Sequence, residues 1–445
     1  MSTPTYAIIG GSLWGNRGAE AMVSVVVGEI RRSQPDARFA LHTYHPDEDR
    51  AILTDPTIDV LDVTPRTVAL RMIPAAALHG VVGPLLRRVG VGWCPASIAG
   101  MVRSDVVVDV SGIAFNDGRL GVSLYNLLSV LPAHLVGTPV VRLSQAFGPL
   151  ERPANRLLAR VALRLGTHAV ARGQRSLALL DRAGLADPAR TSVAPDLALL
   201  YDDGYCLTEP HTDRVEELEA WMRDDDTPVV AVVPSSLLLG RFREDGRDYV
   251  TAVVTQVEHL LGTGRRVLLL PNATKHGTGS ERNNDFTAID AAMCRLEEAG
   301  VMTASPGAVR AVDFDVNTTG IRRLIAACEA VVTSRFHAMV AALALGVPVM
   351  VLGWSHKYTE VLAAFGQGRH AVDALTEVAP GDDGREGSGA LGERIDAFLA
   401  AAPAERARIA AALPGVVADA RKQIALAVGR QRERAARRGR ARRQG

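Results

Sequence analysis

Short apolar, β-branched runs alternate with amphipathic stretches along most of the chain, and this rhythm constrains the fold more than any other feature. The run "SDVVVDVSG" at 104–112 is almost continuously apolar, as expected of a parallel strand that is covered on both faces. The stretch "GAEAMVSVVVGEIRRS" at 18–33 has helical spacing. Strands and helices that alternate in this way predict a doubly wound parallel sheet.

The rhythm occurs twice, on either side of the polar and irregular segment "YDDGYCLTEPHTD" at 201–213. One compact core rarely extends over 445 residues, so two domains of roughly 200 residues each are expected. We predict an α/β protein with two Rossmann-like, doubly wound domains facing a cleft. The expected parts are an N-terminal domain at 1–200, a C-terminal domain at 201–385 and a helical C-terminal segment at 386–445.

Composition excludes several classes of protein. The net charge is +1 and charged residues make up 22%, which does not indicate a nucleic-acid binder. The four cysteines are widely spaced without a CxxC pair, so neither a zinc site nor a disulfide framework is expected. The first residues, "MSTPTYAIIGGS", lack the pattern of a signal peptide. These features favour a cytoplasmic protein, and they leave its oligomeric state open.

Two segments suggest contact with a membrane. The stretch "MIPAAALHGVVGPLL" at 72–86 is apolar but contains two Pro, two Gly and a His, so we expect a buried or interfacial helix and not a span. The tail at 429–445 carries eight Arg and one Glu. It is expected to be a solvated, partly disordered end, and the alternative is contact with anionic lipid or polymer precursors. Peripheral membrane contact is therefore possible for this chain.

Ligands of doubly wound sheets bind outside the carboxyl ends of the strands, so the turns that follow strands are the places to search. The first turn, "IIGGSLWGNRGAEAM" at 8–22, is rich in glycine and precedes a helix, where backbone N–H groups and the helix dipole suit an anion. The alternative is a tight strand–helix turn without a ligand. The candidate binding residues here are Gly11, Ser12, Gly15 and Asn16.

Other turns of the first domain add further candidates. Asp109 lies inside an apolar strand and needs either a partner or a function, and Gly112 begins the polar segment that follows. Gln145 ends a later strand. Arg172 follows a strand and precedes a helix, where it would place a cation at the end of the strand. Ordinary turns and a surface salt bridge are the alternatives for these residues.

In the second domain, a long polar loop at 268–286 contributes Lys275 and His276 as candidates. The stretch "VVTSRFHAMVAALALGVPVMVLGWSHK" at 331–357 contributes Ser334, Arg335, His337 and Lys357. If 334–337 remain extended, Arg335 and His337 point to the same side and Phe336 to the opposite one. A guanidinium beside a group that titrates near neutrality suits an anionic substrate that undergoes proton transfer.

These motifs resemble the polysaccharide pyruvyl transferase family. The matching elements are "GGSLWGNRGAEAM", "DVSGIAFND", "SQAFGPL", "ARGQRSL" and above all "SRFHAMVAALALGVPVMVLGWSHKY", which together extend from about residue 8 to about residue 366. The resemblance implies a GT-B-like fold and transfer of the pyruvyl group of phosphoenolpyruvate to a saccharide or glycolipid as a ketal, without a metal or organic cofactor. It also implies an acceptor-side first domain, a donor-side second domain, and functional roles for Arg335, His337 and Arg172.

Phosphoenolpyruvate carries a carboxylate and a phosphate, so at least two fixed cations are expected, and Arg335 and Arg172 would supply them from opposite domains. An acid must protonate the methylene carbon and a base must accept a proton from the sugar hydroxyl. His337 is the candidate for one of these roles, and the sequence leaves the second open among His276, Asp109 and Glu20. A glycosyltransferase that uses a nucleotide sugar, with Glu360 on the ribose, is the main alternative, and an inactive scaffold is the third.

Overall fold

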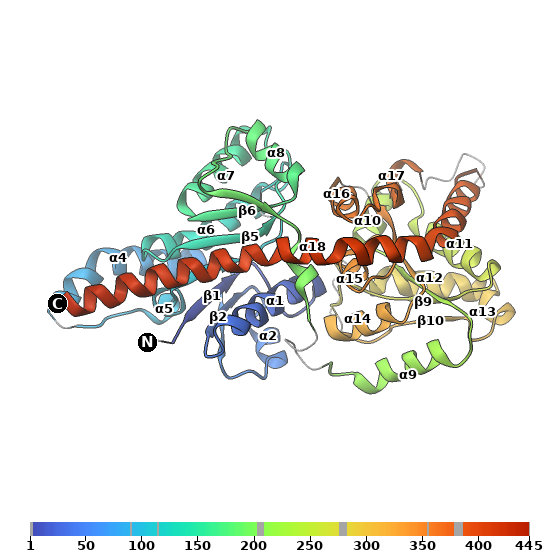
Figure 1. The fold of residues 1–445 in the computed structure, drawn as a ribbon, viewed down its shortest axis with the longest axis horizontal. Coiled ribbons are helices and arrows are strands. Elements are labelled where there is room, and N and C mark those ends of the chain that lie inside the picture. Colours follow the sequence, from blue (N-terminus) through green and yellow to red (C-terminus); the bar gives the residue numbers. More distant parts are fainter. Residues whose placement is uncertain are drawn as a thin grey trace. The chain divides into compact units, whose positions relative to one another are not determined.

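In the computed structural model, the chain forms two compact units (Figure 1). Residues 3–89, 91–113, 115–202, 209–275, 283–353, 356–377 and 386–444 are described by the structure. Unit 1 consists of residues 1–14, 19–206 and 417–445, and unit 2 consists of residues 15–18 and 207–416. The short segment Gly15–Gly18 therefore clusters with unit 2, although it lies near the start of the sequence.

Unit 1 is built on a seven-stranded parallel sheet in the order β3-β2-β1-β4-β5-β6-β7. The strands are rich in Val, Ile and Ala because both faces of the sheet are covered by helices. Their bounds are β1 Thr5–Ile9, β2 Arg38–Thr43, β3 Ile58–Asp62, β4 Val106–Asp109, β5 Val140–Gln145, β6 His168–Arg172 and β7 Thr191–Ala194.

The helices of unit 1 connect these strands in sequence. A π-helical turn joins two of them into one continuous helical stretch that begins at Pro65. Their bounds are α1 Arg17–Ser33, α2 Pro46–Ile52, α3 Pro65–Thr67, η1 Val68–Met72, α4 Ile73–Arg88, α5 Ala96–Arg103, α6 Leu120–Leu135, α7 Pro153–Leu165, α8 Gln174–Arg182 and the 3-10 helix η2 Leu197–Leu200.

Unit 2 repeats the design with a six-stranded parallel sheet in the order β10-β9-β8-β11-β12-β13. Both sheets thus share the 3-2-1-4-5-6 order of a doubly wound fold, which unit 1 extends by one strand. The bounds are β8 Val229–Val233, β9 Arg266–Leu269, β10 Val309–Ala311, β11 Ala330–Thr333, β12 Val349–Gly353 and β13 Ala371–Asp373. The predicted pair of Rossmann-like sheets is confirmed.

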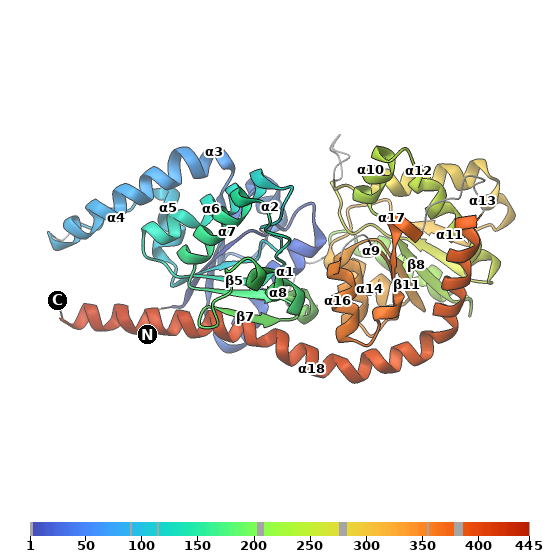
Figure 2. The same ribbon diagram turned by 90° about the horizontal axis from the view of Figure 1, so that it is seen from above.

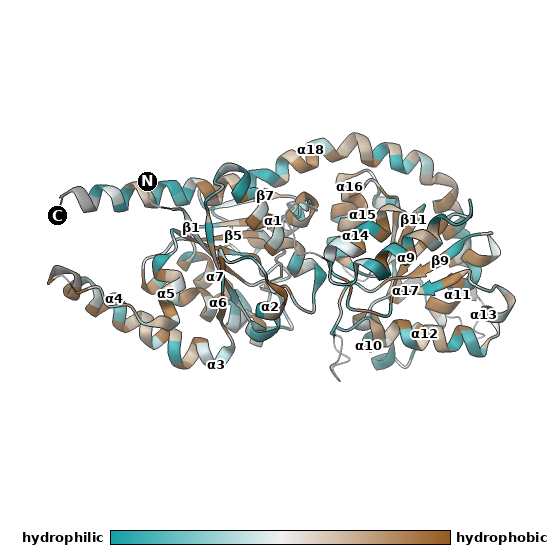
Figure 3. Ribbon diagram, turned by 90° about the horizontal axis from the view of Figure 1, so that it is seen from below, coloured by the Kyte–Doolittle hydropathy of each residue, from teal (hydrophilic) through white to brown (hydrophobic). Residues whose placement is uncertain are grey.

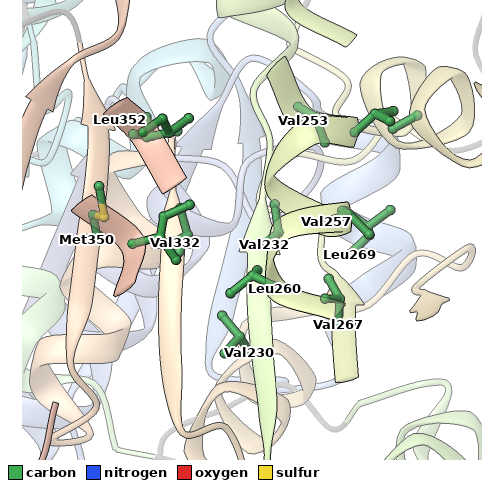
Figure 4. Packing of buried hydrophobic residues seen from close by; sticks show 14 of the residues in the cluster. Val230, Val232, Val253, Val257, Leu260, Val267, Leu269, Val332, Met350 and Leu352 are labelled. Carbon is green, nitrogen blue, oxygen red and sulfur yellow. The ribbon is translucent and has the colours of Figure 1, made fainter. Parts of the chain in front are cut away.

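Helices cover both faces of the second sheet, and their apolar sides form its core. Val230 and Val232 of β8, Val267 and Leu269 of β9, and Val332 of β11 point toward the same layer of buried side chains (Figure 4). The bounds are α9 Thr212–Arg223, α10 Ser236–Glu244, α11 Tyr249–Gly262, α12 Phe286–Glu298, α13 Val301–Ala304, α14 Thr318–Ala326, α15 Phe336–Ala344, α16 His356–Ala364, η4 Gly368–His370, α17 Ala374–Glu377 and α18 Glu386–Gln444.

Helix α18 is helical from Glu386 to Gln444, which confirms the predicted helical C-terminal segment. Its residues up to Val416 cluster with unit 2 and those from Val417 onward cluster with unit 1. The expectation of a partly disordered tail is wrong for 429–444, because this part is a helix that is tied to unit 1. Arg434 donates to the Gly137 carbonyl, and Arg438 pairs with Asp105 at 2.9 Å.

Candidate active site

The carboxyl ends of β8 and β11 form the centre of the candidate site in unit 2. These strands are hydrogen-bonded neighbours although about 100 residues separate them, and they flank the point where the strand order reverses. Ligands of doubly wound folds bind outside such a reversal point. Ser235 and Ser236 follow β8, while Ser334 and Arg335 follow β11, so the two turns lie side by side.

Arg335 is held by a network of buried polar groups. Its Nε donates to Asp285 at 2.9 Å, its Nη1 to the Asn283 side chain at 3.0 Å, and its Nη2 to the Ser236 hydroxyl at 3.0 Å. Nη2 also contacts Asp285. Four of the five guanidinium N–H groups are thus used, so the side chain can offer one further hydrogen bond, from Nη1, without rearrangement.

Asp285 organises this network from the N-cap position of α12. Its carboxylate is fully buried, and besides Arg335 it accepts hydrogen bonds from the backbone N–H groups of Ser236, Asn272 and Ala273 at 2.9–3.1 Å. The turns after β8, β9 and β11 are therefore fixed to a single carboxylate. The sequence places Asp285 in the polar loop at 268–286 but does not connect it with Arg335, from which 50 residues separate it.

His337 lies in the first turn of α15, which begins at Phe336. The expectation that 334–337 are extended is therefore wrong. Thr333 Oγ1 accepts from the Arg335 N–H at 2.9 Å, and the Met339 N–H donates to the Arg335 carbonyl at 3.2 Å, so the helix starts immediately after Arg335. The alternation argument consequently does not hold for His337.

The imidazole of His337 is packed against Gly18 from the short N-terminal segment of unit 2. A Cβ atom on Gly18 would lie 1.9 Å from His337 Nδ1, so only glycine leaves room for the ring in this position. The ring also makes an edge contact with Phe336, with centroids 5.1 Å apart. The backbone at Gly18 thus forms one wall around His337.

Arg17 is a second buried cation of unit 2 that the sequence patterns did not single out. Its Nη2 donates to the Thr274 hydroxyl at 2.7 Å and pairs with Asp315 at 2.5 Å, and its side chain is 4% exposed. Its carbonyl accepts from the Thr318 hydroxyl at 2.9 Å. The signal for Arg17 was its place at the end of the glycine-rich turn, as the first residue of α1, where a cation joins a predicted anion site.

The remaining candidates of unit 2 lie around these two arginines. The stem of Lys275 runs past Gly15, and Lys357 Nζ lies 5.2 Å from the ring centre of Phe336. The Ser334 hydroxyl is bonded to the buried Tyr249 hydroxyl at 3.1 Å, which makes it part of the local framework. Burial raises the pKa of Tyr249 to about 12. His276 lies outside the described residues.

In unit 1, the turn after β1 surrounds a carboxylate of the protein itself. The Leu13 and Trp14 N–H groups donate to Asp49 at 3.0 and 2.8 Å, and the Ser12 hydroxyl donates to it at 3.1 Å. Burial raises the pKa of Asp49 above its usual range. The predicted anion-binding N–H groups therefore hold Asp49. Gly11 lies close to Val23, where a Cβ atom would be 2.5 Å from a methyl group.

Asp109, Gly112 and Gln145 form a buried group at the carboxyl ends of β4 and β5. Asp109 is 1% exposed and forms an ion pair with the fully buried Arg142. Arg142 is therefore the partner that was expected for a carboxylate inside an apolar strand. Gln145 donates to the Leu143 carbonyl at 3.0 Å. The Gly112 carbonyl accepts from the Ala146 N–H, and its φ of +70° suits glycine.

The other unit 1 candidates have clear structural partners. Arg172 donates to Asp196 at 2.7 Å, and both side chains are buried. Asp196 also caps the 3-10 helix η2. Glu20 is fully buried, so neither it nor Asp109 presents an oxygen atom to solvent. Asn16, in unit 2, is exposed and accepts from the Gly18 N–H at 3.1 Å.

Within the described part of the chain, no group of three or more His, Cys, Asp or Glu side chains has the arrangement of a metal site. The described cysteines, Cys94, Cys294 and Cys328, are free thiols.

Comparison with known proteins gives a family and a fold. The family model described as polysaccharide pyruvyl transferase matches residues 16–356. Comparison with the curated proteins found no significant match.

Among solved structures, UDP-GlcNAc 2-epimerase from Neisseria meningitidis bound to UDP-GlcNAc is similar at 12% identity and a TM-score of 0.55, over 96% of this chain and 99% of that one. UDP-GlcNAc 2-epimerase from Methanocaldococcus jannaschii is similar at 12% identity and a TM-score of 0.54, over 89% and 93%. The glycotransferase of kitacinnamycin is similar at 13% identity and a TM-score of 0.50, over 97% and 100%. These neighbours confirm a GT-B-like fold.

Proposed function

Because the chain belongs to the polysaccharide pyruvyl transferase family, we propose that it moves the pyruvyl group of phosphoenolpyruvate to a sugar as a ketal. The family identifies a transferase with a pyruvyl donor and a polysaccharide acceptor. We further propose that the donor is phosphoenolpyruvate and that the acceptor can be a lipid-linked saccharide. The observation that carries it is the convergence of Arg335, Arg17 and His337 at the carboxyl edge of the second sheet.

The proposed reaction adds two neighbouring sugar hydroxyls to C2 of the donor. An acid protonates the methylene carbon, which becomes a methyl group, and the first hydroxyl bonds to C2 as its proton passes to a base. The C–O bond to phosphate then breaks, and the second hydroxyl closes the ketal. The two sugar hydroxyls release two protons. One replaces the proton that the acid gave to the methylene carbon, and the second leaves with inorganic phosphate. No redox partner is needed.

His337 is proposed to carry one of the two proton transfers, because imidazole exchanges protons near neutral pH. The backbone wall at Gly18 holds its ring in one position. Arg335 is proposed to stabilise the negative charge of the donor through its remaining N–H and the field of its guanidinium. Arg17 reaches Thr274, in the neighbouring turn after β9, and adds a second buried positive charge. The assigned role of Arg172 remains a prediction.

A nucleotide-sugar glycosyltransferase is the alternative, since a similar solved structure is described as bound to UDP-GlcNAc. Thermal unfolding of the purified chain with phosphoenolpyruvate or UDP-GlcNAc separates the two. A ligand that binds only the folded state at about 100 times its Kd stabilises it by about 2.7 kcal/mol. We expect phosphoenolpyruvate to raise Tm and UDP-GlcNAc to leave it unchanged. The reverse result would favour the alternative, and no effect of either would favour an inactive scaffold.

Two substitutions test the assigned roles. His337→Ala is expected to abolish pyruvyl transfer and to retain binding of phosphoenolpyruvate, whereas Arg335→Ala is expected to weaken binding severely. Because Arg335→Ala leaves Asp285 without its partner, Arg335→Lys keeps the charge and separates loss of binding from loss of folding. Arg310→Ala, on the partly exposed pair with Glu217, serves as the control. Normal transfer by both the His337→Ala and Arg335→Ala variants would refute the assignment.

We propose a cytoplasmic location for the enzyme. Contact with the inner face of a membrane would bring it to a lipid-linked acceptor. Such contact requires a suitable surface on the protein.

A further inference from the structure

The continuous helical stretch of unit 1 that comprises α3, η1 and α4 is both long and apolar. Residues Pro65–Leu86 have a mean hydropathy of 1.4 in their most apolar 18-residue window, and 28% of that window is buried. Length and composition alone would allow this segment to cross a membrane. A core helix of a globular protein would be buried over most of its surface, so the low burial needs another explanation.

One face of this helix belongs to the core of unit 1. Val68, Met72 and Ala76 are at most 1% exposed and pack in the same cluster as Ala7 and Ile9 of β1. Crossing a membrane would remove this face from the core. The helix is therefore fixed to unit 1 along its first half.

The second half of the helix is also fixed, by close contact with α6. At Gly80, a Cβ atom would lie 2.8 Å from the carbonyl oxygen of Leu135, at the end of that helix. The next glycine, Gly83, lies against the His79 ring of its own helix. The helix thus has a fixed orientation on unit 1, with one side turned to the protein and the other to solvent.

The solvent side is apolar along its whole length. Leu70 is 75% exposed, Leu78 is 53%, Val81 is 71% and Leu85 is 56%. The spacing of these residues, at 70, 78, 81 and 85, places them on one stripe of an α-helix, opposite the buried stripe at 68, 72 and 76. Figure 3 shows the helix in brown and white, in contrast to the mainly teal end of α18 in the same unit.

Charge on and around the helix is positive. From Val63 to Ser104 the sequence contains five Arg and no Asp or Glu. Arg66 and Arg71 lie in the first turns of the helix, and Arg87 and Arg88 end it. The C-terminal end of α18, with its many arginines, extends from the same side of unit 1 as the free end of α4 in Figures 1 and 2.

We propose that the exposed stripe of this helix lies in the surface of a lipid bilayer that contains anionic lipids. An apolar stripe with cationic ends is the pattern of helices that lie in the plane of the interface, where side chains enter the acyl layer and arginines contact head groups. The fixed buried face excludes a spanning orientation. The inference does not depend on the donor or acceptor of the proposed reaction.

A second copy of the chain is a weaker candidate for the partner. If two such helices packed side by side, the arginines at their ends would face one another in a parallel and in an antiparallel arrangement, because both ends are cationic. The helix has no acidic residue with which to form pairs across such an interface. An anionic lipid surface, in contrast, satisfies both the apolar stripe and the charges.

Co-sedimentation of the purified full chain with lipid vesicles tests the inference in the absence of phosphoenolpyruvate. We expect binding to vesicles of phosphatidylcholine mixed with phosphatidylglycerol and much weaker binding to phosphatidylcholine alone. The double variant Leu78→Glu and Leu85→Glu should reduce the partition coefficient between vesicles and water by roughly 100-fold or more. The reason is that two leucine side chains no longer enter the acyl layer. Both positions are exposed, so folding, monitored by Tm, should remain close to that of the parent chain.

The control is Leu157→Glu, which introduces a single glutamate at an exposed leucine of α7 in unit 1. It should lower binding far less than the double variant. The inference is overturned if the parent chain does not bind anionic vesicles, or if the double variant binds as well as the control. It is also overturned if light scattering shows a dimer that the double variant converts to a monomer, because the stripe is then an interface between copies.

Discussion

At the scale of single residues, the candidate site depends on Asp285. This carboxylate is fully buried and is the common acceptor for Arg335 and for three backbone N–H groups of the turns after β8 and β9. It keeps the guanidinium in one orientation and limits it to one further hydrogen bond. Asp285 is thus a positioning residue whose loss should affect both folding and donor binding.

Asp285→Asn keeps the size of the side chain but leaves Arg335 as an unpaired buried charge. Breaking a buried ion pair by removal of one partner costs about 3–5 kcal/mol, so we expect a clearly lower Tm. In protein that remains folded, KM for phosphoenolpyruvate should rise more than kcat falls. Asp290→Asn, on the exposed side of the same helix α12, is the control. An unchanged KM would show that Asp285 has only a structural role.

Gly18→Ala tests the wall around His337. The φ angle of Gly18 lies outside the left-handed region, so alanine fits the backbone, but its Cβ atom would displace the imidazole. A displacement of about 1 Å can reduce turnover on the order of 100-fold, and we expect such a loss in kcat with little change in Tm. Gly240→Ala, in open space on α10, should leave kcat unaltered. Full activity of Gly18→Ala would mean that the position of His337 is not critical.

The residue-scale features differ in how well sequence predicts them. Arg335 and His337 were selected because polar residues at the end of an apolar strand are conspicuous. Their geometry was not predictable, because the start of α15 is set by the Thr333 hydroxyl and not by strand alternation. The pairs of Asp285 with Arg335 and of Asp315 with Arg17 were missed, since each forms between segments that are distant in the sequence.

At the scale of elements, helix α18 completes unit 1 at an irregular point of the sheet. Strand β5 changes register between Arg142 and Gln145, and Ser144 has a φ of +50°. Gln423 of α18 accepts hydrogen bonds from the Ser144 N–H and hydroxyl at 2.8 and 3.1 Å, and donates to the Pro195 carbonyl at 2.7 Å. The fully buried Gln423 therefore supplies the partners that a regular strand would supply.

Gln423→Ala should lower the free energy of unfolding of unit 1 by roughly 1–3 kcal/mol, because buried groups of Ser144 and Pro195 lose their partner. Urea unfolding of the parent chain and the variant measures the difference. The neighbouring Lys422→Ala removes only an exposed pair with Asp419 and should change stability by less than about 1 kcal/mol. Equal effects of the two variants would exclude the proposed role of Gln423.

Most elements were predictable because strands covered on both faces are continuously apolar and are followed by helices with amphipathic spacing. The outer strands β3, β10 and β13 were not identified. Strands β10 and β13 have only three residues each, and β3 contains Asp59 and Asp62 and is only partly buried, so it lacks the continuous apolar pattern. Periodicity predicted a helix for the C-terminal segment. It did not reveal that α18 contributes to both units, because that depends on contacts such as Gln423 with Ser144.

At the scale of the whole molecule, each unit contains a histidine that burial keeps neutral. Burial lowers the pKa of His42 in unit 1 to about 4. In unit 2, burial and the positive charges of Arg369 and Arg408 lower the pKa of His370 to about 4. Unfolded histidine titrates near pH 6.5, so between about pH 6.5 and 4 the unfolded state binds more protons than the folded state.

Stability should therefore be complete above about pH 6.5 and should decrease as the pH falls toward 4. For His42, a shift from 6.5 to about 4 corresponds to about 3 kcal/mol. Urea unfolding at a series of pH values should show a shallower decrease for His42→Gln than for the parent chain. The exposed His134→Gln should retain the parent profile. Identical profiles for all three proteins would contradict the assignment to His42.

The division of α18 between the units has a consequence for biosynthesis. Residues 207–416 of unit 2 leave the ribosome before residues 417–444, which complete unit 1. The nascent sheet of unit 1 must therefore remain without its last helix while the whole of unit 2 is translated. During this time Ser144 lacks its partner Gln423, and Asp105 lacks its partner Arg438. Domains generally fold in the order of their synthesis, but here the first to begin is the last to finish.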